Sequence, residues 1–388
     1  MKTRRKELRP DRETLLGGLA PADFLREYWH KRPLLIRQAV PDVVGRLSPV
    51  ELRRLAMRED CESRLVRHAR GRWSLDYGPF TAAALDRLPR RGWSLLVSGV
   101  DHHLPYAAAL LQSFGFVPYA RLDDVMVSLA PPGGGVGPHF DSYDVFLIQG
   151  HGTRRWEIAE QDDLELVEDA PLRILKRFTP QQSWVLEPGD MLYLPPRLAH
   201  NGVALSECMT WSVGFRAPSH QEIASAFLDY LQEGLNIEGR YADPDLEVPS
   251  HPAALPAAMI ERLGAVIDGI RWSRDDIVDF LGRYLSEPKP NVFFEPPRRA
   301  MGRERFTDKV GTEGLRLDPR TRMLFHGSTF YINGERLVVP VANRRVLVEL
   351  ADRRALPPKA LPDTLLAVLY DWYKSGYLWP GACPPAVS

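Results

Sequence analysis

Between residues 115 and 217, short apolar runs alternate with turn-forming residues. The runs at 125–130, 143–148 and 154–158 are separated by a Pro-Pro-Gly-Gly-Gly stretch and by a Gly-His-Gly stretch. Apolar runs of this length bounded by Gly and Pro are typical of β-strands. Two more strands are predicted around the Pro-Gly-Asp turn at residues 188–190. The pattern therefore predicts a small β-barrel over residues 115–217.

Helical spacing of apolar positions predicts helices on both sides of this barrel. Those before it lie at residues 21–29, 48–56, 80–88 and 106–112, and those after it at 221–235, 253–267 and 273–285. The helical segment at 218–287 is too thin to enclose a large core of its own, so we expect its apolar stripes to make dimer contacts.

The C-terminal part begins with a proline-rich linker at residues 288–297. Strands are predicted at 322–324, 329–332 and 336–339, an Asn-Gly hairpin turn at 333–334, and helices at 344–352 and 363–375. This order indicates a winged-helix-like module. Residues 289–345 hold twelve Lys and Arg against six Asp and Glu, which leaves nucleic-acid contact open. No interleaving of aromatic and basic residues marks a binding face, so we do not expect direct nucleic-acid binding.

Composition narrows the class of protein. A chain of 388 residues predicts two or three domains, and its formal charge of zero gives no overall argument for nucleic-acid or membrane binding. The three cysteines, Cys61, Cys208 and Cys383, lie far apart and are expected to be free thiols of a reducing cytosol. The basic start at residues 2–9 is not followed by an apolar stretch, and no run approaches about 20 apolar residues. We expect a cytoplasmic protein without membrane contact.

Three residues form a candidate metal site. His139 and Asp141 lie two positions apart on an extended segment, so their side chains project from the same side. Such a pair alone is more often a solvated turn. His200 follows the Pro-Gly-Asp turn, 61 residues after His139, where a returning strand can bring it to the same ion. Two His and one carboxylate are typical of non-haem Fe(II) oxygenases, although such a site accepts several divalent ions.

Residues 133–150, the Arg-Arg-Trp at 154–156 and the N-terminal stretch 24–37 resemble the bacterial ribosomal oxygenases of the JmjC, cupin-like class. The resemblance spans nearly the whole chain. It implies an α+β fold with a catalytic domain at 1–217 that contains a double-stranded β-helix (jelly-roll) barrel with flanking helices. A helical dimerisation region at 218–287 and a winged-helix-like domain at 288–388 would follow. It also implies Fe(II) as cofactor, 2-oxoglutarate and O2 as cosubstrates, and 3-hydroxylation of an arginine of large-subunit ribosomal protein sixteen.

Strand phase singles out Arg154, which has the same parity as the apolar Trp156 and Ile158. An arginine directed into a barrel needs a partner, either a core acid or the distal carboxylate of 2-oxoglutarate. The family resemblance implies the second role, and it places Ser128 against the same carboxylate. His102, His103 and His151 are not expected to be ligands.

The sequence does not decide which side chains hold the target residue. Tyr143, Asp144, Asp123 and Asp124 are candidates for stacking on and pairing with a guanidinium. Residues 157–170 hold seven acids and no base, which would suit a basic protein loop or would simply be a solvated loop.

Alternatives therefore remain for the function. The same chemistry would fit a histidine of another ribosomal protein or a methylated side chain. A metal-binding cupin without oxygenase activity is the alternative from another class, and Arg154 and Ser128 argue against it.

Overall fold

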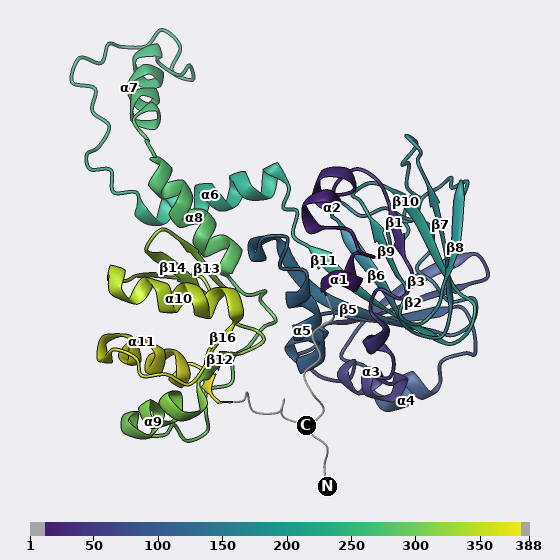
Figure 1. The fold of residues 1–388 in the computed structure, drawn as a ribbon. Coiled ribbons are helices and arrows are strands. Elements are labelled where there is room, and N and C mark those ends of the chain that lie inside the picture. Colours follow the sequence, from purple (N-terminus) through teal and green to yellow (C-terminus); the bar gives the residue numbers. More distant parts are fainter. Residues whose placement is uncertain (1–11, 382–388) are drawn as a thin grey trace. The chain divides into compact units, whose positions relative to one another are not determined.

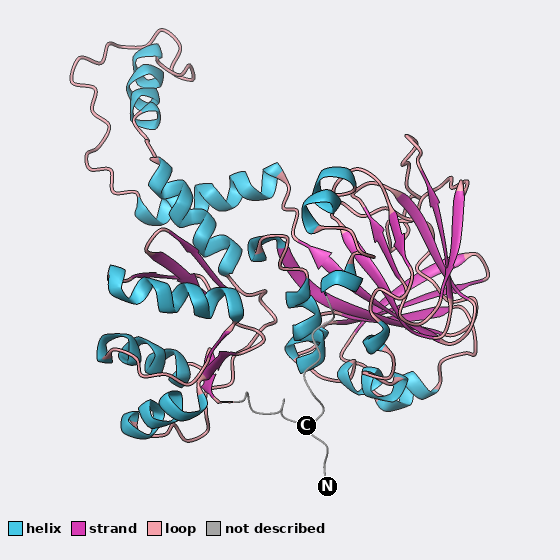
Figure 2. Cartoon of the chain, viewed as in Figure 1, coloured by secondary structure: helices cyan, strands magenta, loops and turns pink. Residues whose placement is uncertain are grey.

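The computed structural model describes residues 12–381, and its contacts divide the chain into two units. The first comprises the chain up to Ala217, Pro288–Thr321 and the chain from Val346 onwards. The second comprises Pro218–Glu287 and Arg322–Arg345. The strands of the first unit include the predicted barrel (Figures 1 and 2).

Two antiparallel sheets build the barrel. The larger has the order β1-β9-β6-β11-β5-β4-β2-β3 and the smaller the order β10-β7-β8. The strands of the larger sheet are β1 (Leu34–Ile36), β2 (Ser63–Ala69), β3 (Arg72–Tyr77), β4 (Trp93–Val97), β5 (Leu122–Ala130), β6 (Val145–His151), β9 (Met191–Leu194) and β11 (Cys208–Phe215). Those of the smaller sheet are β7 (Arg154–Ala159), β8 (Gln182–Leu186) and β10 (Ala199–Ala204). The predicted fold class is confirmed, while β2, β3 and β4 extend the sheet beyond the expected barrel.

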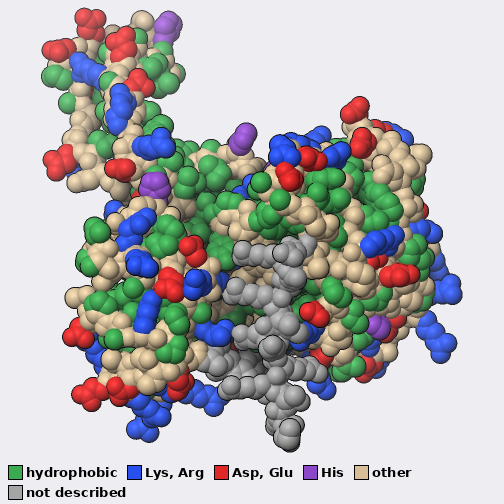
Figure 3. Space-filling model, viewed as in Figure 1, with side chains coloured by type: hydrophobic (Ala, Val, Ile, Leu, Met, Phe, Trp, Pro, Cys, Tyr) green, Lys and Arg blue, Asp and Glu red, His purple; other side chains and the backbone are tan. Residues whose placement is uncertain are grey.

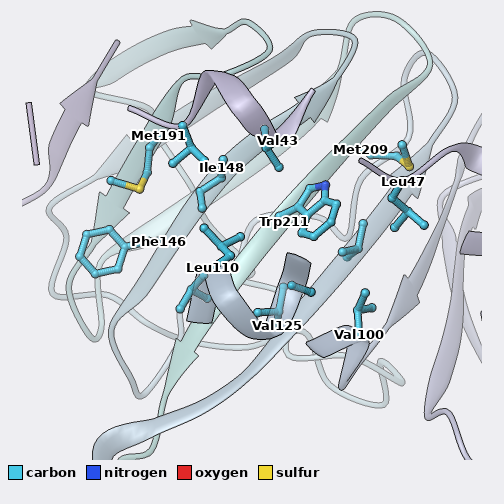
Figure 4. Packing of buried hydrophobic residues seen from close by; sticks show 14 of the residues in the cluster. Val43, Leu47, Val100, Leu110, Val125, Phe146, Ile148, Met191, Met209 and Trp211 are labelled. Atoms are coloured by element: carbon cyan, nitrogen blue, oxygen red, sulfur yellow. The ribbon is translucent and has the colours of Figure 1, made fainter. Parts of the chain in front are cut away.

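One face of the large sheet carries the main core. Val125 and Val127 of β5 and Trp211 of β11 are fully or almost fully buried there. Figure 4 shows Val125 and Trp211 packed with Phe146 and Leu110. Helices cover this face: α1 (Arg12–Leu15), α2 (Pro21–Glu27), α3 (Pro49–Leu55), α4 (Ala82–Asp86) and α5 (Pro105–Ser113). Strand alternation thus commits every second residue of β5 and β11 to this core.

The opposite face of the sheet looks towards β7, β8 and β10. Leu147 of β6 packs there with Trp156 and Ile158 of β7 and with Leu192 of β9 in a second core. The burial pattern of β7 alternates as the sequence predicts, with Arg154, Trp156 and Ile158 buried. The space between the two sheets continues beyond this core as the pocket described below.

The Pro-Gly-Asp turn joins β8 to β9 and holds β1. Gly189 takes φ +97, a left-handed value that favours glycine. The Asp190 carboxylate accepts hydrogen bonds from the backbone N–H groups of Gln38 and Glu187, both at 3.0 Å. Arg37 pairs with the same carboxylate at 2.6 Å. The turn thereby fixes the edge strand β1 against β9.

The second unit contains three helices and a three-stranded sheet. They are α6 (His220–Gly234), α7 (Ala257–Asp268), α8 (Arg274–Ser286), β13 (Met323–His326), β14 (Thr329–Ile332) and β15 (Glu335–Val338). Asn333 and Gly334 have φ 50 and φ 86, which confirms the predicted hairpin turn. Gly282 of α8 lies against the Tyr331 ring, where a Cβ would come within 2.3 Å. No residue of α7 is buried.

The remaining C-terminal elements complete the winged-helix-like part. They are α9 (Arg303–Glu313), β12 (Leu315–Leu317), α10 (Val341–Arg353), β16 (Ala355–Leu356), α11 (Asp363–Lys374) and β17 (Leu378–Pro380), with the sheet order β16-β12-β17. The helices predicted at 344–352 and 363–375 are confirmed. The short strands of this sheet and α9 were not predicted.

The distribution of surface charge and the state of the described cysteines agree with what the composition predicts. On the face shown in Figure 3, acidic and basic side chains are interspersed over the described residues. Cys61 and Cys208 are free and buried, and burial raises the pKa of Cys61 to about 12. Cys383 and the basic stretch 2–9 lie outside the described residues. Within residues 12–381, no helix is long and apolar enough to cross a membrane.

Candidate active site

His139 and His200 face each other across a short antiparallel pairing. Each backbone N–H donates to the other residue's carbonyl, at 2.9 Å and 2.8 Å. This pair of hydrogen bonds places the two imidazole rings on the same side, with their centroids 4.2 Å apart. The residues before β6 thus act as a short extra strand beside β10, which explains how ligands 61 positions apart come together.

Hydrogen bonds orient both rings. Nδ1 of His139 lies 2.9 Å from the Gly137 carbonyl, and Nδ1 of His200 lies 2.9 Å from the Leu198 carbonyl. A ring whose Nδ1–H donates to a carbonyl offers the lone pair of Nε2 to a metal. Burial, with the neighbouring His139 ring, lowers the pKa of His200 to about 4. His200 is therefore a neutral imidazole at physiological pH, as metal ligation requires.

Asp141 completes the group. Its Oδ2 lies 3.8 Å from Nε2 of His200, and one ligand atom from each of the three residues falls within 4.8 Å of the others. A divalent ion placed among these atoms would meet two nitrogens and one oxygen, the donor set typical of Fe(II) oxygenases. The donor set thus fits such an ion, as the sequence predicts.

Arg154 lies in the same pocket and is almost fully buried, at 3% exposure. Its Nε and Nη2 have no hydrogen-bond partner among the described residues. Its Cζ lies 5.7 Å from the centroid of the Trp156 ring. A buried guanidinium without a counter-ion is costly, so a site of this kind calls for an anionic ligand.

Ser128 lies on the facing sheet. It is 6% exposed and lines the same pocket from β5, directly opposite Thr210 in the register with β11. The Thr210 hydroxyl donates to Gln149 at 3.1 Å. A dicarboxylate would therefore meet a guanidinium on one sheet and a hydroxyl on the other.

The pocket encloses ≈ 320 Å³ between the two sheets of the first unit. We call the part lined by the triad, Arg154 and Ser128 the buried end, because Arg154, Ser128 and His200 are buried. We call the part lined by Asp123, Asp124, Tyr143 and Lys289 the outer end, because these side chains keep part of their surface exposed. Tyr143 is 40% exposed, and the Asp141 charge, with burial, raises its pKa, so the phenol remains protonated.

One predicted substrate residue lies elsewhere. Asp144 is fully buried and is not part of the pocket, because its carboxylate accepts a hydrogen bond from Tyr193 at 2.6 Å and lies 3.3 Å from His30 Nε2. In contrast to its predicted contact with a target side chain, Asp144 lies outside the pocket lining and ties the N-terminal region to the barrel.

The acidic stretch at 157–170 is partly neutralised. Asp163 pairs with Arg177 at 2.5 Å, and Glu165 pairs with Lys176 at 2.8 Å. These pairs favour the interpretation of a solvated loop.

Sequence reasoning missed Lys289 as a pocket residue. It lies in the proline-rich linker, 150 positions after His139, and its ammonium contacts both Asp123 and Asp124. Glu62, which directly precedes β2, and Arg64 of β2 also line the pocket and were not predicted. The only available signal was the alternation of polar and apolar residues in β2, which does not indicate which strand it joins.

Comparisons with known proteins agree with this site. Residues 109–223 match the family model of the JmjC domain, and residues 269–379 match that of the ROXA-like winged helix. The ribosomal protein uL16 3-hydroxylase of Escherichia coli is 36% identical over 365 residues, which cover 92% of this chain and 96% of that protein. A probable ribosomal oxygenase of Haemophilus influenzae is 31% identical with the same coverage of both chains.

Solved structures give the same result. A crystal structure of the E. coli protein has a TM-score of 0.82 and covers 93% of this chain and 98% of that one. A structure of that ribosomal oxygenase in complex with cobalt and 2-oxoglutarate has a TM-score of 0.78 at 36% identity. On its sequence, its fold and the geometry of its pocket, this chain belongs to the JmjC-domain ribosomal oxygenases.

Proposed function

We propose that this protein is an Fe(II)- and 2-oxoglutarate-dependent oxygenase that 3-hydroxylates an arginine of ribosomal protein uL16, which is large-subunit protein sixteen. The unpaired Arg154 guanidinium in the same pocket as the His-Asp-His group is the observation that carries this proposal. A cupin without oxygenase activity has no use for a buried cation beside its metal. The name of the E. coli relative supplies the substrate protein.

Each residue of the buried end has a proposed task. His139, Asp141 and His200 would hold Fe(II), and Arg154 and Ser128 would grip the distal carboxylate of 2-oxoglutarate. The bound metal and cosubstrate supply the oxidation, in which 2-oxoglutarate and O2 give succinate, CO2 and the hydroxyl of the product. Trp156 and Leu147 line the same pocket and exclude water from the reacting groups.

The outer end supplies binding for the target side chain. Asp123 and Asp124 offer carboxylates to a guanidinium, and Tyr143 offers an aromatic face beside them. All three side chains line the same pocket, so one bound side chain can meet them together. A fixed guanidinium holds the carbon to be hydroxylated at a defined distance from the metal.

Mass spectrometry of uL16 tests this proposal. After incubation of uL16 with the protein, Fe(II), 2-oxoglutarate and O2, one arginine should gain the mass of one oxygen atom, and His139→Ala should give no product. A gain on a histidine, or loss of a methyl group from a modified side chain, would assign one of the alternative targets. Succinate formed without any modified residue would keep the oxygenase and discard uL16.

We also propose the three-part division into 1–217, 218–287 and 288–388. The unit boundaries after Ala217 and after Glu287 support it. The winged-helix family model begins at residue 269, within α6–α8, so α8 is shared between the two C-terminal parts in that alignment.

The helical region is our proposed dimer contact. On α7, Ile260, Leu263 and Ile267 are 57%, 42% and 67% exposed, and together they form an apolar stripe at helical spacing. Light scattering should show that Ile260→Glu together with Ile267→Glu converts a dimer to a monomer. The double variant should still form succinate, because the pocket is unchanged.

We also propose a cytoplasmic location, which the ribosomal substrate and the free thiols of Cys61 and Cys208 support.

A further inference from the structure

Asp123 and Asp124 are neighbours in β5, yet both line the pocket. In a regular strand, adjacent side chains point to opposite faces. The pairing of β5 with β11 is irregular here, because Val125 lies opposite Val213 and Leu122 lies opposite Phe215. Two residues of β5 therefore face the single Gly214, which is a β-bulge. Bulges re-aim side chains next to functional sites, and this one turns both carboxylates towards one place.

Lys289 occupies that place. Its Nζ lies 3.0 Å from Oδ2 of Asp123 and 3.2 Å from Oδ2 of Asp124. The side chain is 33% exposed and reaches the pocket from the start of the proline-rich linker, within the first unit. Arg216 also lies 3.5 Å from Asp123. Burial raises the pKa of Asp124, and the positive charge of Lys289 opposes this shift.

We call the place between the Asp123 and Asp124 carboxylates the seat. Its chemistry suits a larger cation than an ammonium. A guanidinium is planar and has five N–H donors, so it can bridge two carboxylates, whereas an ammonium acts as a compact point charge. Two half-buried carboxylates without any cation would repel each other and pay for desolvation. A cation beside both carboxylates therefore stabilises this place, whether it comes from the protein or from the substrate.

We infer that Lys289 is a tethered cation that fills the seat of the target guanidinium in the substrate-free protein and leaves it when an arginine enters. This inference rests on the proposed function, because it takes the target to be cationic. Lys289 thereby sets selectivity. A neutral side chain of arginine's shape cannot displace it, whereas a guanidinium exchanges one paired cation for another. The apparent affinity for the substrate is thereby reduced to the fraction of time that the seat is free of Lys289.

A purely structural role of Lys289 makes a different prediction. If the ammonium only anchors the linker to β5, its removal lowers the melting temperature and leaves the affinity for arginine unchanged or weakened. If it competes with the substrate, its removal strengthens binding.

Calorimetry on the full chain, loaded with Mn(II) and 2-oxoglutarate without oxygen, separates the two. The probes are Nα-acetyl-arginine N-methylamide and the matching citrulline amide, which has the same shape without the charge. Lys289→Met should bind the arginine probe about ten-fold more tightly than the wild type, and the wild type should bind the citrulline probe more weakly than the arginine probe. Lys289→Arg, which keeps the cation, should bind it no more tightly than the wild type. Lys309→Met is the matched control, because it removes an exposed lysine paired with Glu313.

Unchanged or weaker arginine binding by a folded Lys289→Met protein overturns the inference, and Lys289→Gln provides the same comparison if the Met variant does not fold. Equal affinity of the wild type for both probes also overturns it, because the carboxylates are then not the seat. Tight arginine binding without hydroxylation of uL16 leaves the inference standing and removes only the proposed target. In turnover assays, the KM of the Lys289→Met protein for an arginine substrate should be lower than that of the wild type, with kcat unchanged.

Discussion

The buried end and the outer end of the pocket balance their charges in opposite ways. At the buried end, Arg154 has two nitrogens without a partner among the described residues. At the outer end, Lys289 contacts two carboxylates at 3.0 Å and 3.2 Å. The buried end therefore depends on a ligand to complete its electrostatics, whereas the outer end is complete without one.

This difference corresponds to the two molecules that the pocket is proposed to bind. A cosubstrate that is needed in every cycle can be left as the sole partner of a buried cation, because binding then gains the full strength of an unscreened pair. A protein substrate that varies in supply leaves the outer end empty for much of the time. A site with its own cation remains stable during that time.

The largest effect is expected from loss of a metal ligand, which would disable both ends together. His139→Ala should reduce metal content to background and turnover by at least about 100-fold, because even changes behind the ligands cost 10-fold to 100-fold. Metal analysis and succinate formation measure this. His151→Ala removes a histidine of β6 that does not line the pocket and should behave as the wild type. Full turnover by His139→Ala would show that the metal lies elsewhere.

Arg154→Met tests the buried end, and its two effects should have opposite signs. Affinity for 2-oxoglutarate should fall by about 100-fold, since truncating one partner of a buried charge pair costs about 2–5 kcal/mol. Without ligand, the variant should be more stable by about 1 kcal/mol, because Met removes an unpaired buried charge. Metal binding should be unchanged. Calorimetry and urea denaturation give the two values.

Arg155→Met is the matched control for this variant. Arg155 has the opposite parity on β7 and pairs with Glu157 at 3.1 Å near the surface, so both effects should be small. Destabilisation of the ligand-free Arg154→Met protein would contradict the comparison, since it would mean that Arg154 already has a stabilising partner.

The residues that gather at the buried end could be predicted from the sequence because their determinants are local. Parity on one strand separates Arg154 from Arg155, and a His-x-Asp pair on an extended segment needs no knowledge of distant residues. The Pro-Gly-Asp turn then places His200 one strand further on. The same logic predicted the Asn-Gly hairpin and most helices, whose signals lie within each segment.

The outer end could not be predicted in this way because it depends on register between distant strands. The bulge at Asp123 and Asp124 exists only through the pairing of β5 with β11, and Lys289 approaches from a linker that has no periodic pattern. Asp144 was misplaced for a similar reason. It precedes β6, so strand parity does not fix its direction, and Tyr193 of β9 captures it. The three-residue strands β12 and β17 are too short for any periodicity.

Asp124→Asn tests the outer end, with signs that differ from those of Arg154→Met. The substitution removes one of the two carboxylates that hold Lys289, so the ligand-free protein should lose about 1 kcal/mol of stability. The KM for an arginine substrate should rise by about ten-fold, since a charge-assisted pair is lost, and the affinity for 2-oxoglutarate should not change. Steady-state kinetics with each substrate varied in turn measure these constants.

Asp162→Asn is the control for Asp124→Asn, because it removes an exposed acid of the loop between β7 and β8. A similar rise in KM with this variant would mean that overall negative charge, and not the seat on β5, attracts the substrate.

Ser128→Ala should give the smallest effect and the finest test of the buried end. If the hydroxyl donates to the same carboxylate as Arg154, its removal costs one hydrogen bond to a charged group that keeps its stronger partner. The loss should be about 0.5–1.5 kcal/mol, or about 2-fold to 12-fold in 2-oxoglutarate affinity. The effect should nearly vanish in the Arg154→Met background, because a carboxylate that is no longer gripped does not remain near β5. A double-mutant cycle measured by calorimetry gives this coupling directly. Additive effects of the two substitutions would mean that Ser128 and Arg154 contact different parts of the cosubstrate.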